Sequence, residues 1–267
     1  MRILTFVRIV DFYVRIMNKS ADHIASFAKG LRVIASFGAE TPRLSITEVA
    51  QATGLDRATA RRCLLTLHSE GYADYDGKYF TLTHKVLRLG MGALASLPLP
   101  QIVQPWLDQL AEQIGQSCSV SVLDDTEIVY LARAAQKRVM SIGLMPGTRL
   151  PAHCTSMGRV LLAALDEVTA LDIVSRSDLT PRTSYSLTEP SEIIERLHDA
   201  RTQGYALIDQ EIEIGLRSLA VPVLNARGSV VAALNTGMAA TQSNAESIVT
   251  DYLPALLKVQ QGLRRVL

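Results

Sequence analysis

A glycine at position 54 separates two short segments that both carry helical patterns, and this arrangement limits what the chain can fold into. The segment before it, "LSITEVAQATG", places Val49 and Ala50 on one helical face, and Thr47 can cap that helix. The segment after it begins at Asp56, a good N-cap, and continues to about residue 70. Two short helices joined by a tight glycine turn predict a helix-turn-helix.

A hairpin signal follows the second helix. The β-prone runs "YADY" and "KYFTL" are joined by Asp76 and Gly77, and an Asp-Gly pair favours a two-residue turn in which both positions have positive φ. A third helix is predicted earlier, over residues 26–38, with Gly38 as its stop. A helix-turn-helix followed by a hairpin is typical of a winged helix-turn-helix, which binds DNA.

The second helix carries arginines away from its apolar face. Four residues share that face, namely Ala60, Cys63, Leu64 and Leu67. Ala58 and Arg62 lie opposite, with Thr59 and Arg61 on the flanks. Arginines alone would indicate only a solvated face, but the helix–turn–helix–hairpin order favours DNA binding. The predicted DNA-binding residues are Thr47, Arg57, Ala58, Thr59, Arg61, Arg62 and, beside the hairpin turn, Lys78.

The rest of the chain alternates helices with β-prone runs. An apolar helix is predicted over residues 84–96 and a linker at "LPLPQ", residues 97–101. A helix around Trp106 precedes three runs, "SCSVSVL", "EIVYLARA" and "VMSIGLMPG", and a loop, "TRLPAHCTS", leads into the helix "MGRVLLAAL". Helices are predicted over 167–175 and 189–203, the second capped by Thr188. Three more runs follow, "YALID", "LRSLAVPVL" and "VVAALNTGM", and then a final helix with a capping box of Ser243 and Glu246.

Six strands in two groups of three, with helices around them, predict an α+β domain on one antiparallel sheet. We therefore divide the chain into an N-terminal extension (1–23), a winged helix-turn-helix domain (24–83), a linker helix and linker (84–100) and a second domain (101–267). Residues 17–90 hold 10 basic and 7 acidic side chains, whereas residues 91–267 hold 14 and 18. A basic N-terminal part and an acidic C-terminal part suggest two different functions, although chance variation between two solvated surfaces would give the same charge balance.

The N-terminal segment "MRILTFVRIVDFYVRI" is too short and too charged to cross a membrane, and no signal-peptide cleavage site follows it. Two expectations are open for this segment: Met17 is the natural start, or the first residues are a loose or amphipathic appendage. Three scattered cysteines, Cys63, Cys118 and Cys154, fit a reducing compartment. We therefore expect a cytoplasmic protein.

The second domain lacks the common catalytic signatures. It has no HExxH, GxSxG, Gly-rich phosphate loop or metal-spaced Cys/His cluster, so no catalytic residue, metal or cofactor is predicted. His153 and Cys154 are adjacent, and neighbours in an extended loop point apart. The remaining alternatives are a small-molecule enzyme carrying a DNA-binding appendage and a constitutive DNA-binding protein whose C-terminal domain is structural.

The stretch "CTSMGR" leads directly into a helix, so backbone N–H groups near Ser156, Met157 and Gly158 are predicted to be free. A helix N-terminus attracts anions, and a small carboxylate would suit it. An ordinary Ser-capped helix packed on the sheet fits the same residues. Arg133 and His153 could complement an acid, or each could be a surface group.

The chain resembles the IclR family of bacterial transcriptional regulators over roughly residues 24–265. The matching stretches are "SFAKGLRVI", "LSITEVAQATGLDRATARRCLLTLHSEGYADYDGKYFTLT", "LPAHCTSMGRVLLAAL", "GYALIDQEIEIGLRSLAVPV" and "VVAALNTG". "DRATARRCLLTL" and "ARAAQKRVMSIGLMPGTRLPAHCTSMGRVLLA" are similar to the branch that controls the protocatechuate and β-ketoadipate pathway.

This resemblance implies a winged helix-turn-helix, a dimerising linker helix and a GAF-like effector domain, assembled as a homodimer or homotetramer on double-stranded promoter DNA. Residues 1–16 have no counterpart in the family pattern. The family's effector pockets imply effector contacts from Ser156, Met157, Gly158, Asp209, Ser218 and Asn235. Asp209 would repel a carboxylate unless it is paired, for example with Arg217. Met157 replaces a smaller residue of relatives, which disfavours the smallest acids. The expected effectors are β-ketoadipate, protocatechuate and 4-hydroxybenzoate.

Overall fold

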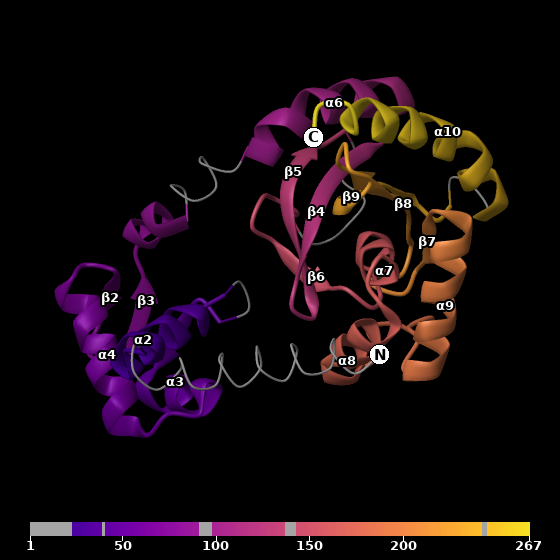
Figure 1. Ribbon diagram of the computed structural model, residues 1–267. Helices are drawn as coiled ribbons and strands as arrows, with labels where there is room; N and C mark the ends of the chain where they lie inside the picture. Colours follow the sequence, from indigo (N-terminus) through magenta and orange to yellow (C-terminus); the bar gives the residue numbers. More distant parts are fainter. Residues whose placement is uncertain (1–22, 39–40, 91–97, 137–142, 242–244) are drawn as a thin grey trace, which may run out of the picture. The chain divides into compact units, whose positions relative to one another are not determined.

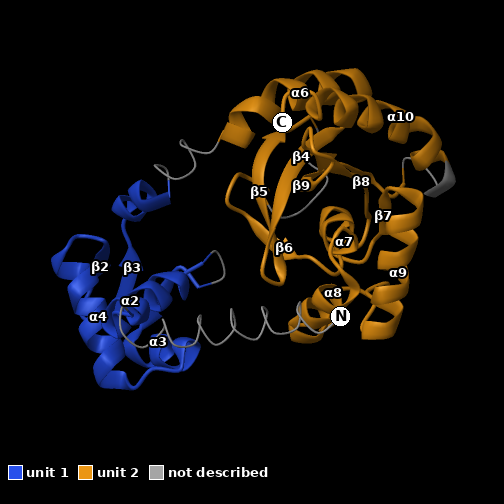
Figure 2. Cartoon of the chain, in the orientation of Figure 1, with its two compact units in different colours: residues 1–93 blue, residues 94–267 orange. Residues whose placement is uncertain are grey.

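The computed structural model describes residues 23–38, 41–90, 98–136, 143–241 and 245–267. The chain divides into two compact units, residues 1–93 and 94–267 (Figure 2). Each unit has its own hydrophobic core, so each is described by itself.

The first unit contains three helices and a small sheet among its described residues. The helices are α2 (Ala25–Ala35), α3 (Ile46–Thr53) and α4 (Arg57–Ser69), and the strands are β1 (Arg43–Ser45), β2 (Ala73–Tyr75) and β3 (Tyr79–Leu82). The strands are antiparallel in the order β1-β3-β2. The predicted helix-turn-helix and hairpin are therefore confirmed, with α2 ending earlier than predicted, at residue 35 rather than 38.

The ends of α3 and α4 follow from short polar side chains and one glycine. Gly54 has a φ of 66°, the left-handed conformation that suits glycine at a helix end. Asp56 caps α4 as predicted, because its Oδ1 accepts from the N–H of Thr59 at 2.8 Å. The predicted cap of α3 was wrong. Ser45, not Thr47, caps that helix, in a capping box with Glu48.

The hairpin turn has three residues, 76–78, and not the two that an Asp-Gly pair predicted. Only Gly77 has positive φ, at 100°. The Asp76 carboxylate orders the turn by accepting from the N–H groups of Lys78 and Tyr79 at 3.0 and 2.8 Å, and it also pairs with Arg43. Two aromatic rings, Tyr75 and Phe80, stack at 4.3 Å between centroids and join the hairpin to the core.

The chain leaves the first unit through a short 3-10 helix, η1 (His84–Val86), followed by helical residues 87–90. The remaining part of the helix predicted over 84–96 lies outside the described residues.

The second unit contains six strands and five helices among its described residues. The helices are α6 (Pro98–Ile114), α7 (Ser156–Ala163), α8 (Glu167–Arg176), α9 (Pro190–Gln203) and α10 (Ala245–Leu263). The strands are β4 (Ser117–Asp124), β5 (Glu127–Ala134), β6 (Arg149–Pro151), β7 (Ala206–Asp209), β8 (Leu216–Leu224) and β9 (Val230–Ala239).

The strands form one antiparallel sheet in the order β6-β5-β4-β9-β8-β7, which confirms the predicted α+β architecture. Helices α6 and α10 cover one face, where they bury an apolar cluster against β4, β8 and β9 (Figure 1). On the other face α7 packs against the sheet, with α8 and α9 outside it. Because α7 packs on β4, β8 and β9, its N-terminus lies beside the strands.

Four predicted details of this unit change. The third strand was placed over 139–147, but described residues 143–147 are not a strand and β6 lies further on, within the predicted loop. The predicted linker at 97–101 is mostly helix, because α6 begins at Pro98, a position where a missing N–H costs nothing. The N-cap of α9 is Glu189, not Thr188. Ser243 lies outside the described residues, and so does the predicted capping box.

Candidate DNA-binding surface and effector pocket

Helix α4 presents an arginine-rich face to solvent. Arg57, Ala58, Arg61 and Arg62 are all exposed, as the helical pattern predicted. The guanidinium of Arg62 donates to the hydroxyl of Thr59 one turn earlier at 3.3 Å, which orients the side chain along the helix. Lys78 is exposed beside the hairpin turn, with its Nζ 4.9 Å from the centre of the Tyr79 ring.

Two predicted DNA-binding residues fall elsewhere. Thr59 is only 6% exposed and lines a groove that residues of α2 also line, so it supports Arg62 and is a poor candidate for direct contact. Thr47 is exposed on α3 but does not cap it.

The face of the large sheet that meets α7 carries polar and small side chains at one end. Cross-strand pairing aligns Ser117 with Gly237 and Gly237 with Ser218, and the next row aligns Ser119 with Asn235. The opposite side chains of the same strands belong to the apolar cluster under α6 and α10. Small polar residues on a sheet leave space, so a pocket forms between this end of the sheet and the start of α7.

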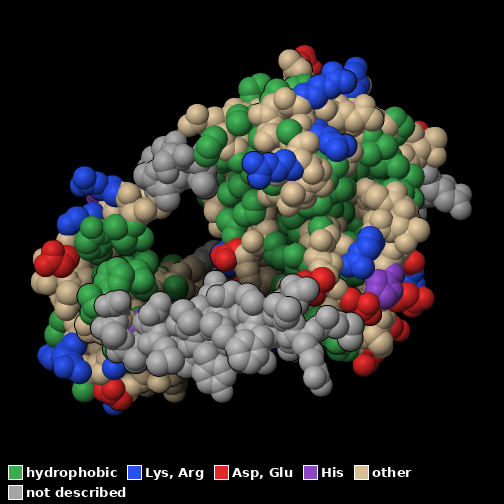
Figure 3. All heavy atoms as spheres, viewed as in Figure 1, with side chains coloured by type: hydrophobic (Ala, Val, Ile, Leu, Met, Phe, Trp, Pro, Cys, Tyr) green, Lys and Arg blue, Asp and Glu red, His purple; other side chains and the backbone are tan. Residues whose placement is uncertain are grey.

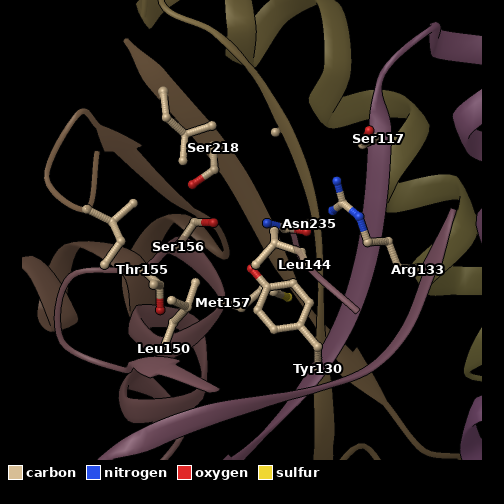
Figure 4. Close-up of a pocket in the computed structure, with 13 residues that line it drawn as sticks. Ser117, Tyr130, Arg133, Leu144, Leu150, Thr155, Ser156, Met157, Ser218 and Asn235 are labelled. Carbon is tan, nitrogen blue, oxygen red and sulfur yellow. The ribbon is translucent and has the colours of Figure 1, made fainter. Parts of the chain in front are cut away.

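This pocket brings together four of the six predicted effector residues. Ser156 and Met157 come from the start of α7, Ser218 from β8 and Asn235 from β9 (Figure 4). Leu144, Leu150 and Ile212 add apolar walls. The pocket is small, with a cavity volume of about 40 Å³. A ligand the size of an aromatic ring therefore needs side chains in the walls to move.

The N-terminus of α7 offers hydrogen bonds to this pocket. Thr155 is the N-cap, so its hydroxyl takes up the N–H of Gly158 at 3.2 Å. Within the described part of the chain, the N–H groups of Ser156 and Met157 have no acceptor. The Ser156 hydroxyl is buried, at 1% exposure, and likewise lacks a hydrogen-bond partner. Three polar groups are thus left for a ligand at one end of the pocket.

Gly158 and Asp209 are not among the residues that line the pocket, so the structure does not bring them together with the other four predicted residues. A Cβ on Gly158 would lie 2.1 Å from the carbonyl oxygen of Ala152, so this glycine lets α7 pack on the preceding loop. Asp209 pairs with Arg217 across β7 and β8 through two bonds of 2.7 and 3.0 Å, the pairing that was considered from the sequence. The Arg217 guanidinium holds the pKa of Asp209 below its usual value, so this carboxylate remains charged and engaged away from the pocket.

His153 also lies outside the pocket, next to a buried ion pair. The guanidinium of Arg159 binds the His153 carbonyl oxygen at 2.8 Å and the Glu211 carboxylate at 2.7 Å. Burial, reinforced by Arg159 and Arg182, lowers the pKa of His153 to about 4. His153 is therefore neutral near pH 7 and is unsuited to pair with an acid.

Tyr130 and Arg133 of β5 also line the pocket. The sequence pattern does not predict Tyr130, and it fits Arg133 either as the partner of an acid or as a surface group. A signal was present in "SCSVSVL", where serine recurs at every second position of an otherwise buried strand. Polar residues on one face of such a strand indicate a hydrated or ligand-binding face, and β5 is the strand that pairs with it.

Two family models match the chain. One describes the IclR helix-turn-helix domain and matches residues 26–77, and the other describes the C-terminal domain of the bacterial transcriptional regulator IclR and matches residues 91–263. The second match alone covers more than half of the chain. The chain belongs to the IclR family. This IclR-family regulator is thus a DNA-binding transcriptional regulator, in agreement with the resemblance found in its sequence.

Relatives of this IclR-family chain include regulators of aromatic metabolism. The Pca regulon regulatory protein of Pseudomonas putida is 40% identical over 91% of this chain and 84% of its own length. The p-hydroxybenzoate hydroxylase transcriptional activator of Acinetobacter baylyi is 39% identical over 93% of both chains. The inducer-binding domain of a PobR double mutant from Acinetobacter, solved with 3-hydroxybenzoic acid, is 34% identical, with a TM-score of 0.59 over 63% of this chain and 98% of that domain.

Among the described residues of this IclR-family protein, no helix combines the length and apolar character needed to cross a bilayer.

Proposed function

We propose that this chain is a ligand-responsive regulator of genes for aromatic-acid breakdown, and that its second unit binds a small carboxylate in the pocket beside α7. β-Ketoadipate, protocatechuate and 4-hydroxybenzoate are the first acids to test. Two relatives support this choice. The Pseudomonas protein is named for the Pca regulon, and the Acinetobacter protein is named for p-hydroxybenzoate hydroxylase. The PobR domain with 3-hydroxybenzoic acid supports a benzoate-sized ligand for that fold.

The buried Ser156 hydroxyl carries this proposal. A buried hydroxyl without a partner costs free energy, so such groups are uncommon in structures unless a ligand or water completes them. The backbone N–H groups of Ser156 and Met157 add to this site, because N–H groups of the first helical turn project from the N-terminus of a helix. A carboxylate placed here receives charge-assisted hydrogen bonds and the favourable end of the helix dipole.

The other walls set polarity and size. The side chains of Ser218 and Asn235 make no hydrogen bond within the described residues and face the same space (Figure 4). Met157 is fully buried, and its sulfur lies 3.1 Å from the Ser121 hydroxyl. A flexible thioether makes a soft wall, so Met157 limits how deep the acid sits.

The first unit supplies the DNA contacts in this proposal. The N-terminal half of the second helix of a helix-turn-helix enters the major groove. Arg57, Arg61 and Arg62 then reach bases and phosphates, Ala58 permits close approach, and Lys78 contacts the flanking backbone. In this proposal the protein works in the cytoplasm as a homodimer or homotetramer, since a two-fold assembly matches a two-fold operator.

Thermal unfolding with each acid tests the proposed effector site. An acid that binds only the folded state adds roughly 2.7 kcal/mol of stability at 100 times its dissociation constant. We expect at least one of the three acids to raise the melting temperature of the wild type. Ser218→Ala should weaken the response, and Met157→Trp should abolish it by filling the pocket. Ser191→Ala, which changes an exposed serine of α9, is the control that should respond like the wild type.

A wild type that none of the acids stabilises would refute the assignment to aromatic-acid regulation. If the wild type responds and both pocket variants respond equally well, the acid binds elsewhere.

A further inference from the structure

Tyr130 and Arg133 are three residues apart on β5, yet both face the pocket. Side chains of a regular strand alternate, so residues three apart normally face opposite sides of a sheet. Here Ser121 pairs with Tyr130 and Val120 with Ala132, which leaves Leu131 as an extra residue in β5. This bulge reverses the alternation, so Tyr130 and Arg133 lie on the same face of the sheet. Tyr130 pairs with Ser121 of β4, and Arg133 pairs with Ser119.

The Tyr130 side chain is buried, at 3% exposure, and its hydroxyl makes no hydrogen bond within the described residues. The ring packs with the apolar residues of α7, which fixes the position of the hydroxyl at the pocket wall. Burial raises the pKa of Tyr130 to about 12, so the phenol keeps its proton at neutral pH and is available as a donor.

Arg133 is a half-buried cation, and no described residue supplies it with an anionic partner. Its guanidinium donates to the Ser119 hydroxyl at 2.9 Å, and its backbone oxygen accepts from the Gln104 amide at 3.1 Å. No carboxylate of the described residues lies within ion-pair distance of it. Burial lowers the pKa of Arg133, but a guanidinium remains charged at neutral pH. Several of its N–H donors thus remain available on the pocket side.

The pocket therefore has two polar ends. Ser156 and Ser218 lie on one side of it and Arg133 lies across from them, while the Tyr130 hydroxyl points into the space between (Figure 4). Leu144, Leu150 and Met157 contribute the apolar surface of the walls. A ligand that satisfies this arrangement carries oxygen atoms at both ends and an apolar middle.

We propose that Tyr130 and Arg133 form a second oxygen-binding subsite, which holds the far end of an acid whose carboxylate lies at the N-terminus of α7. The far-end group is the hydroxyl of a hydroxybenzoate or the second carboxylate of a linear diacid. Both accept hydrogen bonds from a phenol and a guanidinium. This subsite rests on the proposed function, since it presumes that an acid occupies the pocket.

Calorimetric titration of the full chain with matched pairs of acids tests the subsite. Benzoate and 4-hydroxybenzoate differ only in the far-end hydroxyl, and hexanoate and adipate differ only in the far-end carboxylate. For at least one pair, the wild type should bind the acid with the far-end oxygen roughly 10- to 100-fold more tightly, as expected for hydrogen bonds to a charged group.

Two variants remove the subsite while leaving the α7 end intact. Tyr130→Phe and Arg133→Gln should each reduce that preference by about 10-fold, with the affinity for the acid that lacks the far-end oxygen nearly unchanged. Arg149→Gln is the matched control, because Arg149 pairs with Asp124 and Glu127 outside the pocket, so its preference should equal that of the wild type. Circular dichroism checks that each variant is folded. If Arg133→Gln does not fold, the comparison of Tyr130→Phe with the wild type still decides the test.

The possible results separate the two proposals. A wild type that binds both members of each pair equally well overturns the subsite and leaves the proposed function standing. A preference that survives in folded Tyr130→Phe and Arg133→Gln does the same. Loss of benzoate binding in Arg133→Gln places the carboxylate at Arg133 and overturns the orientation. A wild type that binds none of these acids, nor β-ketoadipate or protocatechuate, refutes the proposed function itself.

Discussion

Gly158 and Ala152 approach so closely that no side chain fits between them. A Cβ on Gly158 would lie 2.1 Å from the Ala152 carbonyl oxygen, and Gly158 is also the residue whose N–H is capped by Thr155. The first turn of α7 therefore packs directly on the preceding loop, and this contact determines the direction of the N–H groups of Ser156 and Met157.

Gly158→Ala should destabilise the second unit, although alanine is the better helix former. Overpacking costs roughly 1–3 kcal/mol, and a Cβ that meets backbone atoms falls at the upper end of that range, which exceeds the propensity gain of about 1 kcal/mol. Thermal unfolding measures the effect. Gly30→Ala is the control, since a Cβ at this helical glycine of α2 meets no atom within 4 Å. If Gly158→Ala is as stable as the wild type, the close packing of α7 on the loop is incorrect.

His153 should make the stability of the protein depend on pH. Because burial lowers its folded-state pKa from 6.5 to about 4, the unfolded chain binds a proton in this window that the folded chain does not. Stability from this group is therefore present above pH 6.5 and is lost as the pH falls towards 4. The loss between pH 7.5 and 5 amounts to roughly 2 kcal/mol.

Denaturant unfolding of the wild type and of His153→Gln at these two pH values measures that loss. The variant should lose about 2 kcal/mol less than the wild type, whatever its stability at pH 7.5. Equal losses in both proteins would show that His153 titrates normally in the folded state.

Arg62→Ala should reduce discrimination between DNA sequences. An arginine in the major groove contributes ~1–3 kcal/mol of base selectivity, and the Thr59 hydroxyl orients this one. Lys78→Ala should weaken binding to all sequences alike and lower the salt dependence, as expected for a phosphate contact. Footprinting of both variants at two salt concentrations distinguishes these effects. An unchanged footprint and affinity for Arg62→Ala would exclude this residue from base readout.

The exposed apolar residues at the end of the first unit should form a dimer seam. The sequence predicts this seam from Val86, Leu87, Leu89, Met91 and Leu94. Leu87 and Leu89 are 63% and 54% exposed, whereas Met91 and Leu94 lie outside the described residues. Hydrophobic side chains also gather on the visible surface of this unit (Figure 3). Leu87→Asp should therefore shift the protein towards monomer in light scattering. A folded variant that stays fully dimeric would show that the seam lies elsewhere.

Local signals were sufficient for most of the fold. Gly54 and Asp56 mark helix ends through their own backbone and side-chain chemistry, so the turn between α3 and α4 was predictable. The missed strand, β6, has three residues, and it exists because Glu127 and Val129 of β5 pair with it. Such a strand depends on a partner and leaves little pattern of its own.

The candidate site was predictable only in part, for the same reason. Ser156 and Met157 follow from a helix start in the sequence, and they line the pocket. Tyr130 and Arg133 escape a period-two pattern, because the bulge at Leu131 appears only when β5 is paired with β4. A helical wheel places Thr59 on a flank of α4, but it cannot show how the rest of the unit buries that flank, and Thr59 is only 6% exposed.

A crystal structure of the full chain grown with 4-hydroxybenzoate decides whether the pocket between α7 and the polar end of the sheet is the effector site. We expect the carboxylate within hydrogen-bond distance of the Ser156 hydroxyl and the Met157 N–H, and the ring hydroxyl beside Tyr130 and Arg133. Ordered 4-hydroxybenzoate bound elsewhere, for example near Arg159 and Arg196 between α9 and β7, with this pocket left to water, would show that the effector site is not here.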